Sequence, residues 1–190
     1  MTKNELRQIF RDKRKLWSQT DLELASQKIA DLFFANIKVP KNGTLHVFLP
    51  IRKLNEINTF HIINPLKKSG RVQICFPKII PETNAMEHIL LDKTTCLEEN
   101  PWGIPEPKDG TRLGSENIDV VLLPLLAFDL KGFRLGYGRG FYDRFLKECR
   151  NDCQFIGLSL EEPINEYLPS DQWDIPMHVC ITPAKIFRFS

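Results

Sequence analysis

Residues 118–124, Ile-Asp-Val-Val-Leu-Leu-Pro, are the stretch of sequence that decides the fold. The run is short, almost continuously apolar and rich in β-branched side chains, which predicts a strand buried on both faces of a sheet. Other short apolar runs alternate with helical patterns: we expect strands at 45–49, 72–76, 155–159 and 179–181 and helices at 3–17, 20–33, 57–68 and 141–149. Apolar runs separated by helices predict an α/β fold with a mostly parallel, Rossmann-like sheet flanked by helices on both faces.

The 190-residue chain is long enough to bury a substantial core, and we expect a single domain over residues 1–190. Its 26 basic and 24 acidic residues give a formal net charge of +2, which argues against the clustered basic excess of nucleic-acid binding proteins. No stretch approaches the roughly 18 apolar residues of a membrane span, and the first residues lack the apolar core of a signal peptide. We therefore expect a cytoplasmic protein that binds neither nucleic acid nor membranes, and a monomer.

The long segment at residues 92–117 and the cysteines lead to two further expectations. Residues 92–117 are rich in proline and glycine, which predicts an extended, functional connection after an edge strand at 86–91. Cys149 and Cys153 lie four residues apart on a predicted helix, which is not the spacing of a zinc or redox CxxC site. Scattered cysteines, five in all, favour free thiols in a reducing compartment.

The carboxyl end of the central strand leads to residues 134–143, Arg-Leu-Gly-Tyr-Gly-Arg-Gly-Phe-Tyr-Asp, which we call the glycine loop. Its alternating glycines allow tight turns and expose backbone N–H groups, while Arg134 and Arg139 add positive charge, so the loop favours a phosphate site. The loop fits neither GxxxxGK[ST] nor GxGxxG, and a structural turn is the alternative. Ligands of parallel sheets gather beyond the carboxyl ends of the strands, where this segment lies.

Two carboxylates are candidate metal ligands. Asp143 closes the glycine loop, and Mg²⁺ prefers one or two carboxylates together with phosphate oxygens. The alternative for Asp143 is a charge that favours the first turn of a helix. Asp174 is the candidate second carboxylate, with a loop or capping residue as the alternative.

Other candidates also have ordinary structural alternatives. Lys3 and Arg7 lie four residues apart and would share one helix face, but basic residues on this first helix are typical of a solvated surface. Glu56 precedes a helix and suits either a cap or a ligand contact. Trp102 lies on a stiff, proline-rich loop, either as a core residue or as a wall for a flat heterocycle. His46 is expected to be a core histidine with satisfied hydrogen bonds.

The glycine loop and its surroundings resemble the 5-formyltetrahydrofolate cyclo-ligase family, whose members are also called methenyltetrahydrofolate synthetases. The resemblance is carried by Leu123-Pro124, Ala127-Phe128-Asp129, Gly132 and the run from Arg134 to Leu146. It extends along nearly the whole chain, through the basic first helix, Phe48-Leu49, Glu56-Ile57-Asn58-Thr59, Trp102 to Pro107, Pro169 and Asp174.

The resemblance implies an enzyme that uses ATP and Mg²⁺ to cyclise 5-formyltetrahydrofolate to 5,10-methenyltetrahydrofolate, with release of ADP and phosphate. It implies ATP contacts by Lys3, Asn4, Glu5, Leu6, Arg7, Arg134, Leu135, Gly136, Tyr137, Gly138, Arg139, Gly140, Phe141 and Tyr142. It implies folate contacts by Arg7, Leu49, Glu56, Tyr137, Gly138, Arg139, Gly140 and Phe141, with Trp102 as a suitable wall for the pterin. Asp143 and Asp174 correspond to magnesium carboxylates, and Arg134, Arg139 and Tyr142 are expected at the reacting groups.

Three features depart from the family pattern. His178 follows Asp174 by four residues, where relatives carry a second aspartate, and Phe141 replaces a frequent tyrosine. Two extra residues lie between Leu49 and Glu56. A non-catalytic nucleotide- or folate-binding protein and a sugar-phosphate enzyme on a similar sheet are the competing functions, because fold alone does not assign function. The near-neutral charge disfavours a nucleic-acid-binding module.

Overall fold

The computed structural model describes residues 1–80, 82–83, 85–93, 95–100 and 103–189. Its helices are α1 (Lys3–Lys15), α2 (Gln19–Asn36), α3 (Phe60–Ser69) and α4 (Phe141–Leu146), with 3-10 turns at Arg52–Leu54 and Ser115–Asn117. Its strands are β1 (Thr44–His46), β2 (Gln73–Ile80), β3 (Ala85–Leu90), β4 (Leu97–Glu99), β5 (Pro105–Pro107), β6 (Arg112–Leu113), β7 (Val120–Pro124), β8 (Ala127–Phe128), β9 (Arg134–Leu135), β10 (Gln154–Leu158), β11 (Val179–Ile181) and β12 (Ile186–Arg188).

Within the described residues, one sheet contains eight strands in the order β12-β11-β10-β7-β1-β2-β3-β6. The strands from β11 to β2 pair in parallel, whereas β12, β3 and β6 pair antiparallel at the two edges. The predicted mostly parallel α/β sheet is therefore confirmed. The parallel strands follow the order β2-β1-β7-β10-β11, so the winding reverses between β1 and β7, and such a switch point is where α/β sheets bind ligands.

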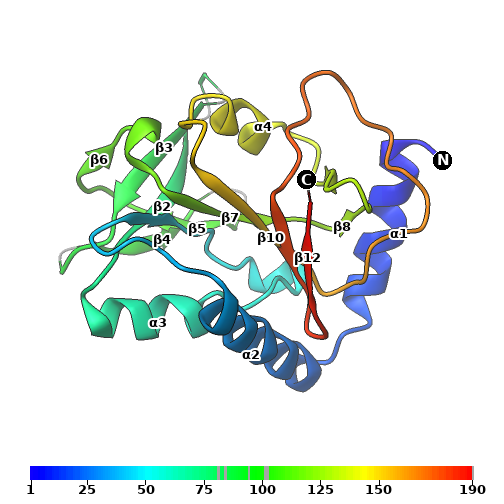
Figure 1. Ribbon diagram of the computed structural model, residues 1–190, viewed down its shortest axis with the longest axis horizontal. Helices are drawn as coiled ribbons and strands as arrows, with labels where there is room; N and C mark the ends of the chain where they lie inside the picture. Colours follow the sequence, from blue (N-terminus) through cyan, green and yellow to red (C-terminus); the bar gives the residue numbers. More distant parts are fainter. Residues whose placement is uncertain (81, 84, 94, 101–102, 190) are drawn as a thin grey trace.

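Helices cover both faces of the sheet, as predicted (Figure 1). The first face packs on α2 and α3 through a large apolar cluster that includes Ile29, Phe33 and Ile63. The opposite face packs on α4 through a second cluster that includes Phe145 and Leu146. These two layers bury the apolar residues of the central strands on both faces of the sheet.

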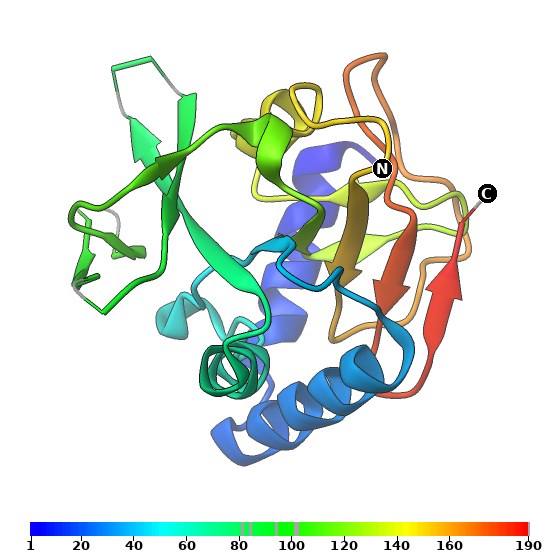
Figure 2. The same ribbon diagram turned by 60° about the vertical axis from the view of Figure 1, so that its left-hand side comes forward.

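The first helix does not cover the sheet directly. α1 lies beside the short β8–β9 hairpin, and Leu6 and Phe10 pack there against Leu126 and Leu135 (Figure 2). Thr2 and Glu5 form a capping box at the start of α1, in which each side chain accepts a hydrogen bond from the other residue's backbone N–H. The glycine loop begins with the two residues of β9, so α1 is packed next to that loop.

Several predicted boundaries are wrong. β2 does not end before Pro77 but continues to Ile80, because β1 stops at the His46–Cys75 pair and no strand needs an N–H on that side of Pro77. The connection at 92–117 is not uniformly extended: it includes the short strands β4, β5 and β6, which Figure 2 shows reaching away from the parallel strands. The hairpin β8–β9 and the edge strand β12 were not predicted, since each is very short.

The structure corrects one part of the expectation for the cysteines. α4 ends at Leu146 rather than near residue 149, so Cys149 and Cys153 do not share a helix. All the cysteines are free thiols, and Cys75, Cys153 and Cys180 are buried. No helix in the described part of the chain has the length and apolar character needed to cross a membrane.

Candidate active site

A cavity of about 480 Å³ opens at the carboxyl ends of β1, β2 and β7. Phe48 and Leu49 follow β1, Ile79 lies near the end of β2, and Pro124 ends β7, and all of them line the cavity. The cavity therefore lies at the switch point of the sheet, and its volume falls within the range of small-molecule sites.

The cavity has an apolar part and a charged part. The apolar lining comes from β2, β3, β5 and the segments after β1 and β4: Phe48, Leu49, Ile51, Leu54, Pro77, Ile79, Met86, Ile104 and Pro105. The charged lining comes from α1, the glycine loop and the segment before β11: Lys3, Arg7, Arg134, Arg139, Asp143, Asp171 and Asp174. Glu56 adds a carboxylate beside the apolar part. One side thus suits a flat organic ring and the other suits a phosphate chain.

The glycine loop needs its glycines where α1 approaches it. Gly138 has φ +101° and Gly140 has φ +67°, which are left-handed values that favour glycine. A Cβ on Gly138 would lie only 3.0 Å from Cζ of Arg7. Glycine at this position therefore lets the Arg7 guanidinium lie directly against the loop backbone.

Three arginines of α1 bind the glycine loop. Nε of Arg7 donates to the Gly136 carbonyl at 3.0 Å, and Nη2 of Arg11 approaches the Tyr137 carbonyl at 3.4 Å. Arg14 is buried, and its Nη1 donates to the Tyr137 hydroxyl at 2.9 Å. Positions 7, 11 and 14 lie on one face of a helix. The interpretation of the basic residues of α1 as a solvated surface is therefore wrong for these three.

The Tyr137 hydroxyl connects α1 to Glu56. It donates a short hydrogen bond to Oε1 of Glu56, whose Oε2 accepts a bond from the Ile51 N–H at 2.8 Å. Burial raises the pKa of the Glu56 carboxyl, although Tyr137, Ile51 and Arg14 act in the opposite direction. Burial and the Glu56 charge likewise raise the pKa of Tyr137 well above its usual value, so Tyr137 stays protonated and donates to Glu56.

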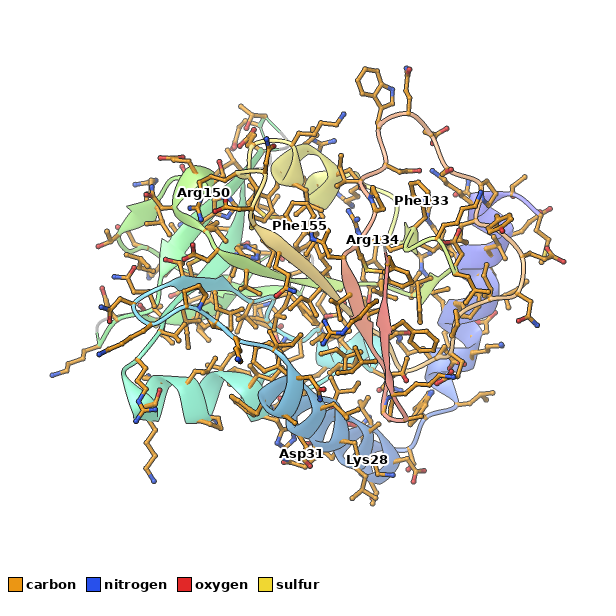
Figure 3. The ribbon with its side chains drawn as sticks, viewed as in Figure 1. Lys28, Asp31, Phe133, Arg134, Arg150 and Phe155 are labelled. Carbon is orange, nitrogen blue, oxygen red and sulfur yellow. The ribbon has the colours of Figure 1, made fainter. Side chains whose placement is uncertain are left out.

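At the charged part of the cavity, Arg134 is paired with Asp143. Nη2 of Arg134 donates to Oδ1 of Asp143 at 2.6 Å, and Nη1 donates to the Ile175 carbonyl at 2.6 Å. Burial lowers the pKa of the Arg134 guanidinium, while the charges of Asp143 and Asp174 oppose this effect. Figure 3 shows Arg134 on the side of the molecule that carries α1, whereas Arg150 lies towards β6.

Lys3 holds the second carboxylate. Its Nζ lies 2.7 Å from Oδ2 of Asp174 and 2.7 Å from Oδ2 of Asp171. Burial lowers the pKa of Lys3, but the two carboxylates outweigh that effect, and the pKa is raised overall. Asp174 also accepts a bond from the Asp171 N–H at 2.8 Å, so it serves the loop locally and faces the cavity as well.

The carboxylates at the charged part of the cavity fit a metal ion that takes most of its coordination from a bound phosphate ligand and water. In the part of the chain that the structure describes, no group of three metal-binding side chains gathers. Asp143 and Asp174 nevertheless line one cavity and act on one guanidinium. Mg²⁺ commonly uses one or two carboxylates and completes its coordination with phosphate oxygens and water. Two carboxylates beside a basic loop match that pattern, whereas Zn²⁺ would need more protein ligands.

Most of the predicted site residues gather around this cavity. The lining includes Lys3, Arg7, Leu49, Glu56, Arg134, Leu135, Gly136, Tyr137, Gly138, Arg139, Gly140, Phe141, Tyr142, Asp143 and Asp174. The next residues of α1 are not in the lining: Asn4 accepts a bond from Arg7 at 2.6 Å, Glu5 caps the helix and Leu6 packs in the core. Trp102 lies outside the described residues, and its neighbours Ile104 and Pro105 line the cavity.

Sequence reasoning missed Arg11, Arg14 and Asp171. The signal for the arginines is their spacing from Arg7, which repeats a helix face, but this spacing does not reveal what the face contacts. Asp171 lies three residues before Asp174, and an Asp-x-x-Asp pair next to a predicted metal carboxylate is a usable signal.

Tyr142 lines the cavity, but its hydroxyl is buried. The hydroxyl has no hydrogen-bond partner among the described residues, and the Tyr142 ring contacts the ring of His46 edge to face. His46 is in the core as predicted, but neither of its ring nitrogens has a partner in the described structure, so the expectation of satisfied hydrogen bonds is wrong. Burial lowers the pKa of His46 well below its usual value, and it raises the pKa of Tyr142 far above its usual value.

Comparisons with known proteins agree on one family. The model of the 5-formyltetrahydrofolate cyclo-ligase family matches residues 1–183. The chain is 29% identical to the 5-formyltetrahydrofolate cyclo-ligase of Escherichia coli K12, over 95% of this chain and 100% of the relative. It is 30% identical to that of Mus musculus, over 80% of this chain and 77% of the relative.

A solved structure gives the same answer. The 5,10-methenyltetrahydrofolate synthetase of Aquifex aeolicus superposes with a TM-score of 0.83 at 30% sequence identity. The superposition covers 99% of this chain and 93% of the Aquifex chain. The match therefore includes α1, the glycine loop and the segment with Asp174. The chain belongs to the 5-formyltetrahydrofolate cyclo-ligase family of enzymes, as the residues around its glycine loop predict.

Proposed function

We propose that the cavity converts 5-formyltetrahydrofolate and ATP into 5,10-methenyltetrahydrofolate, ADP and phosphate. One observation carries the proposal: a single cavity at the switch point combines an apolar part with a basic and acidic part. The apolar part suits the reduced pterin, and the glycine loop with Arg134, Arg139, Lys3 and Arg7 suits the phosphates. Family membership supports the same reaction.

The reaction needs activation rather than a protein nucleophile. The formyl oxygen takes the γ-phosphoryl group of ATP, and ADP leaves. N10 then bonds to the formyl carbon and loses its proton, and the carbon–oxygen bond breaks to release phosphate. Phosphoryl transfer of this kind depends chiefly on positioning and charge neutralisation. The arginines and backbone N–H groups of the glycine loop supply both.

Each predicted catalytic residue has a distinct place in this proposal. Arg139 lines the cavity from the glycine loop, where its charge suits the phosphate chain. Arg134 is buried against Asp143 and acts by holding that carboxylate in position. The ring of Tyr142 lines the cavity while its hydroxyl is buried, so we assign it the role of a wall and not that of an acid or base.

Magnesium would be held by Asp143 and Asp174 together with phosphate oxygens. When bound, the ion neutralises charge on the phosphates. Lys3 pairs with Asp174 and Arg134 pairs with Asp143, so both carboxylates are held in a fixed orientation. The proposal also includes a monomeric state and a cytoplasmic location, and the free cysteines support the location because they fit a reducing compartment.

The test is a direct assay of the purified protein with Mg²⁺, ATP and 5-formyltetrahydrofolate. We expect the ultraviolet absorbance of 5,10-methenyltetrahydrofolate to appear, with one ADP formed per product. Omission of ATP should abolish it, whereas a sugar-phosphate isomerase would need no ATP. Nucleotide binding by a folded protein that forms no product would instead support the binding-only function.

The metal assignment has its own test in Asp143→Asn. This change removes a carboxylate charge from the phosphate end, and we expect turnover to fall at least about 100-fold, the scale on which such electrostatic groups act. Asp152→Asn is the matched control, because Asp152 also pairs with an arginine, Arg150 at 2.9 Å, but is exposed and outside the cavity lining. Normal magnesium-dependent turnover in Asp143→Asn would contradict the assignment.

A further inference from the structure

We propose that Arg14 is a positioning residue for the folate side of the cavity. It fixes the Tyr137 hydroxyl and, through it, holds the Glu56 carboxylate as an anionic acceptor facing the substrate. The inference rests on the proposed function, because it concerns the folate part of the same cavity. Arg14 itself does not line the cavity, so it acts through the two residues that do.

The hydrogen bonds run in one direction. A guanidinium only donates, and Arg14 gives Nη2 to the Leu125 carbonyl at 2.6 Å and Nη1 to the Tyr137 oxygen at 2.9 Å. Because the Tyr137 oxygen accepts from Arg14, its own hydrogen is directed to Oε1 of Glu56. Oε2 of Glu56 accepts from the Ile51 N–H, so both carboxylate oxygens are fixed.

The backbone of Arg14 is tied to the same segment. Nδ2 of Asn55 donates to the Arg14 carbonyl at 3.1 Å and approaches the Trp17 carbonyl at 3.3 Å. Asn55 directly precedes Glu56 and adopts a left-handed φ of 48°, which asparagine tolerates better than most residues. Two independent connections therefore join α1 to the segment that carries Glu56. A surface arginine with an incidental contact would have neither the burial nor this double connection.

Arg14 also adds a positive charge that favours the ionised form of the group that it positions. Glu56 is only 5% exposed, and burial favours its neutral form. The groups that face it are Tyr137 from the glycine loop, Tyr142 from α4 and Arg14 from α1. Among these groups, Arg14 carries the positive charge that favours the carboxylate.

A carboxylate is the form that the proposed substrate requires. The reduced pterin presents N–H donors, and ring closure creates a positive charge spread over N5 and N10. An ionised Glu56 accepts from such donors and stabilises such a charge, whereas a protonated carboxyl would turn a donor towards donors. Arg14 thus acts on the folate side through the Tyr137 hydroxyl, although it lies on the helix whose first turn lines the charged part of the cavity.

The experiment compares Arg14→Gln, Arg14→Lys and Tyr137→Phe with Lys15→Gln, a control at an exposed neighbour that pairs only with Asp12 in the described contacts. Steady-state kcat and KM are measured for folate and for ATP from pH 5.5 to 8.5. Calorimetry measures folate binding without ATP. Arg14→Gln should raise the folate KM about tenfold, leave the ATP KM nearly unchanged and move the acid limb of kcat/KM to higher pH.

The other variants distinguish the effect of the Arg14 charge from the effect of the hydrogen bonds that position Glu56. Arg14→Lys should keep the acid limb in place because it keeps the charge, and Tyr137→Phe should raise the folate KM without altering α1. Lys15→Gln should behave like the wild type. An equal loss of kcat at every pH with an unchanged folate KM would show a merely structural role and overturn the inference.

Each further outcome is decisive. If Arg14→Gln does not fold, an acid limb that shifts in Arg14→Lys, or an unchanged folate KM in Tyr137→Phe, overturns the inference. If the wild type binds folate but forms no product, the proposed function fails, and calorimetry still decides the role of Arg14. If the wild type forms product and Arg14→Gln behaves in the same way as Lys15→Gln, the inference about Arg14 is rejected and the proposed function stands.

Discussion

Two buried polar clusters lie close to the glycine loop, and they are built in opposite ways. In the first, which we call the Glu56 network, Arg14, Tyr137 and Glu56 are joined by hydrogen bonds. In the second, the histidine cluster, the rings of His46, His88 and Tyr142 pack around Phe145. There, both ring nitrogens of His46, Nδ1 of His88 and the Tyr142 hydroxyl have no partner in the described structure.

The comparison distinguishes polar groups that are oriented to bind a ligand from polar groups that are only buried in the core. The Glu56 network faces the cavity, and its charges are oriented by bonds from α1 and from the segment after β1. The histidine cluster lies under α4, and burial lowers the histidine pKa values, that of His88 to about 4. The histidines are therefore neutral at pH 7 and pack much as apolar rings would.

The largest effect should follow removal of the acceptor in the Glu56 network. Glu56→Leu removes the acceptor of the Tyr137 hydroxyl hydrogen and of the Ile51 N–H, and such unsatisfied donors cost about 1–3 kcal/mol each. We expect the free energy of unfolding, measured in urea, to fall by about 3 kcal/mol. Glu98→Leu is the control at an exposed ion pair, with an expected change within about 0.5 kcal/mol. Equal losses in both variants would remove the distinction.

The next effect concerns acid, and it tests the histidine cluster. Unfolded histidine protonates near pH 6.5, whereas burial holds the pKa of folded His88 at about 4, against the opposing charges of Glu116 and Glu87. The folded state therefore binds fewer protons between these values, and stability falls as the pH falls from 6.5 to 4, by about 2 kcal/mol. Urea unfolding at several pH values should show this slope in the wild type and a flatter one in His88→Leu. An identical slope in that variant would assign the acid sensitivity elsewhere.

The smallest effect should have the opposite sign. His46→Leu replaces two unpartnered nitrogens with apolar atoms of similar volume, so we expect a gain of about 1 kcal/mol at pH 7. Thermal unfolding of His46→Leu and of a surface control, His61→Leu, measures it. A loss in His46→Leu would mean that buried water bonds the ring, and the two clusters would then be alike.

The parts of the fold that local pattern controls could be predicted from the sequence. The 118–124 run is a central strand because its side chains are apolar on both faces, and neighbours on either side bury them. Pro77 misled the prediction, because a proline in a strand is harmful only where a partner strand needs its N–H. Nothing in the local sequence shows where β1 stops and thus frees that edge.

The site was predictable where a motif repeats and not where tertiary contacts choose the partner. The glycine loop is recognisable because its glycines and arginines are consecutive. Arg14 is not, since it lies among Arg11, Lys13 and Lys15, and only the fold shows which of these charges is buried. The histidine cluster was unpredictable for the same reason, because its rings come from β1, β3 and α4.

The contacts of α1 have a consequence for the order of folding. Its arginines bond to residues 111 to 129 positions later in the chain. A ribosome therefore releases α1 long before its partners exist, and such distant contacts form late because loop closure costs entropy. A ligand held by both α1 and the glycine loop would favour the docked helix by mass action. Newly made protein should thus resist proteolysis near α1 only after the loop is synthesised, and more strongly when nucleotide is present.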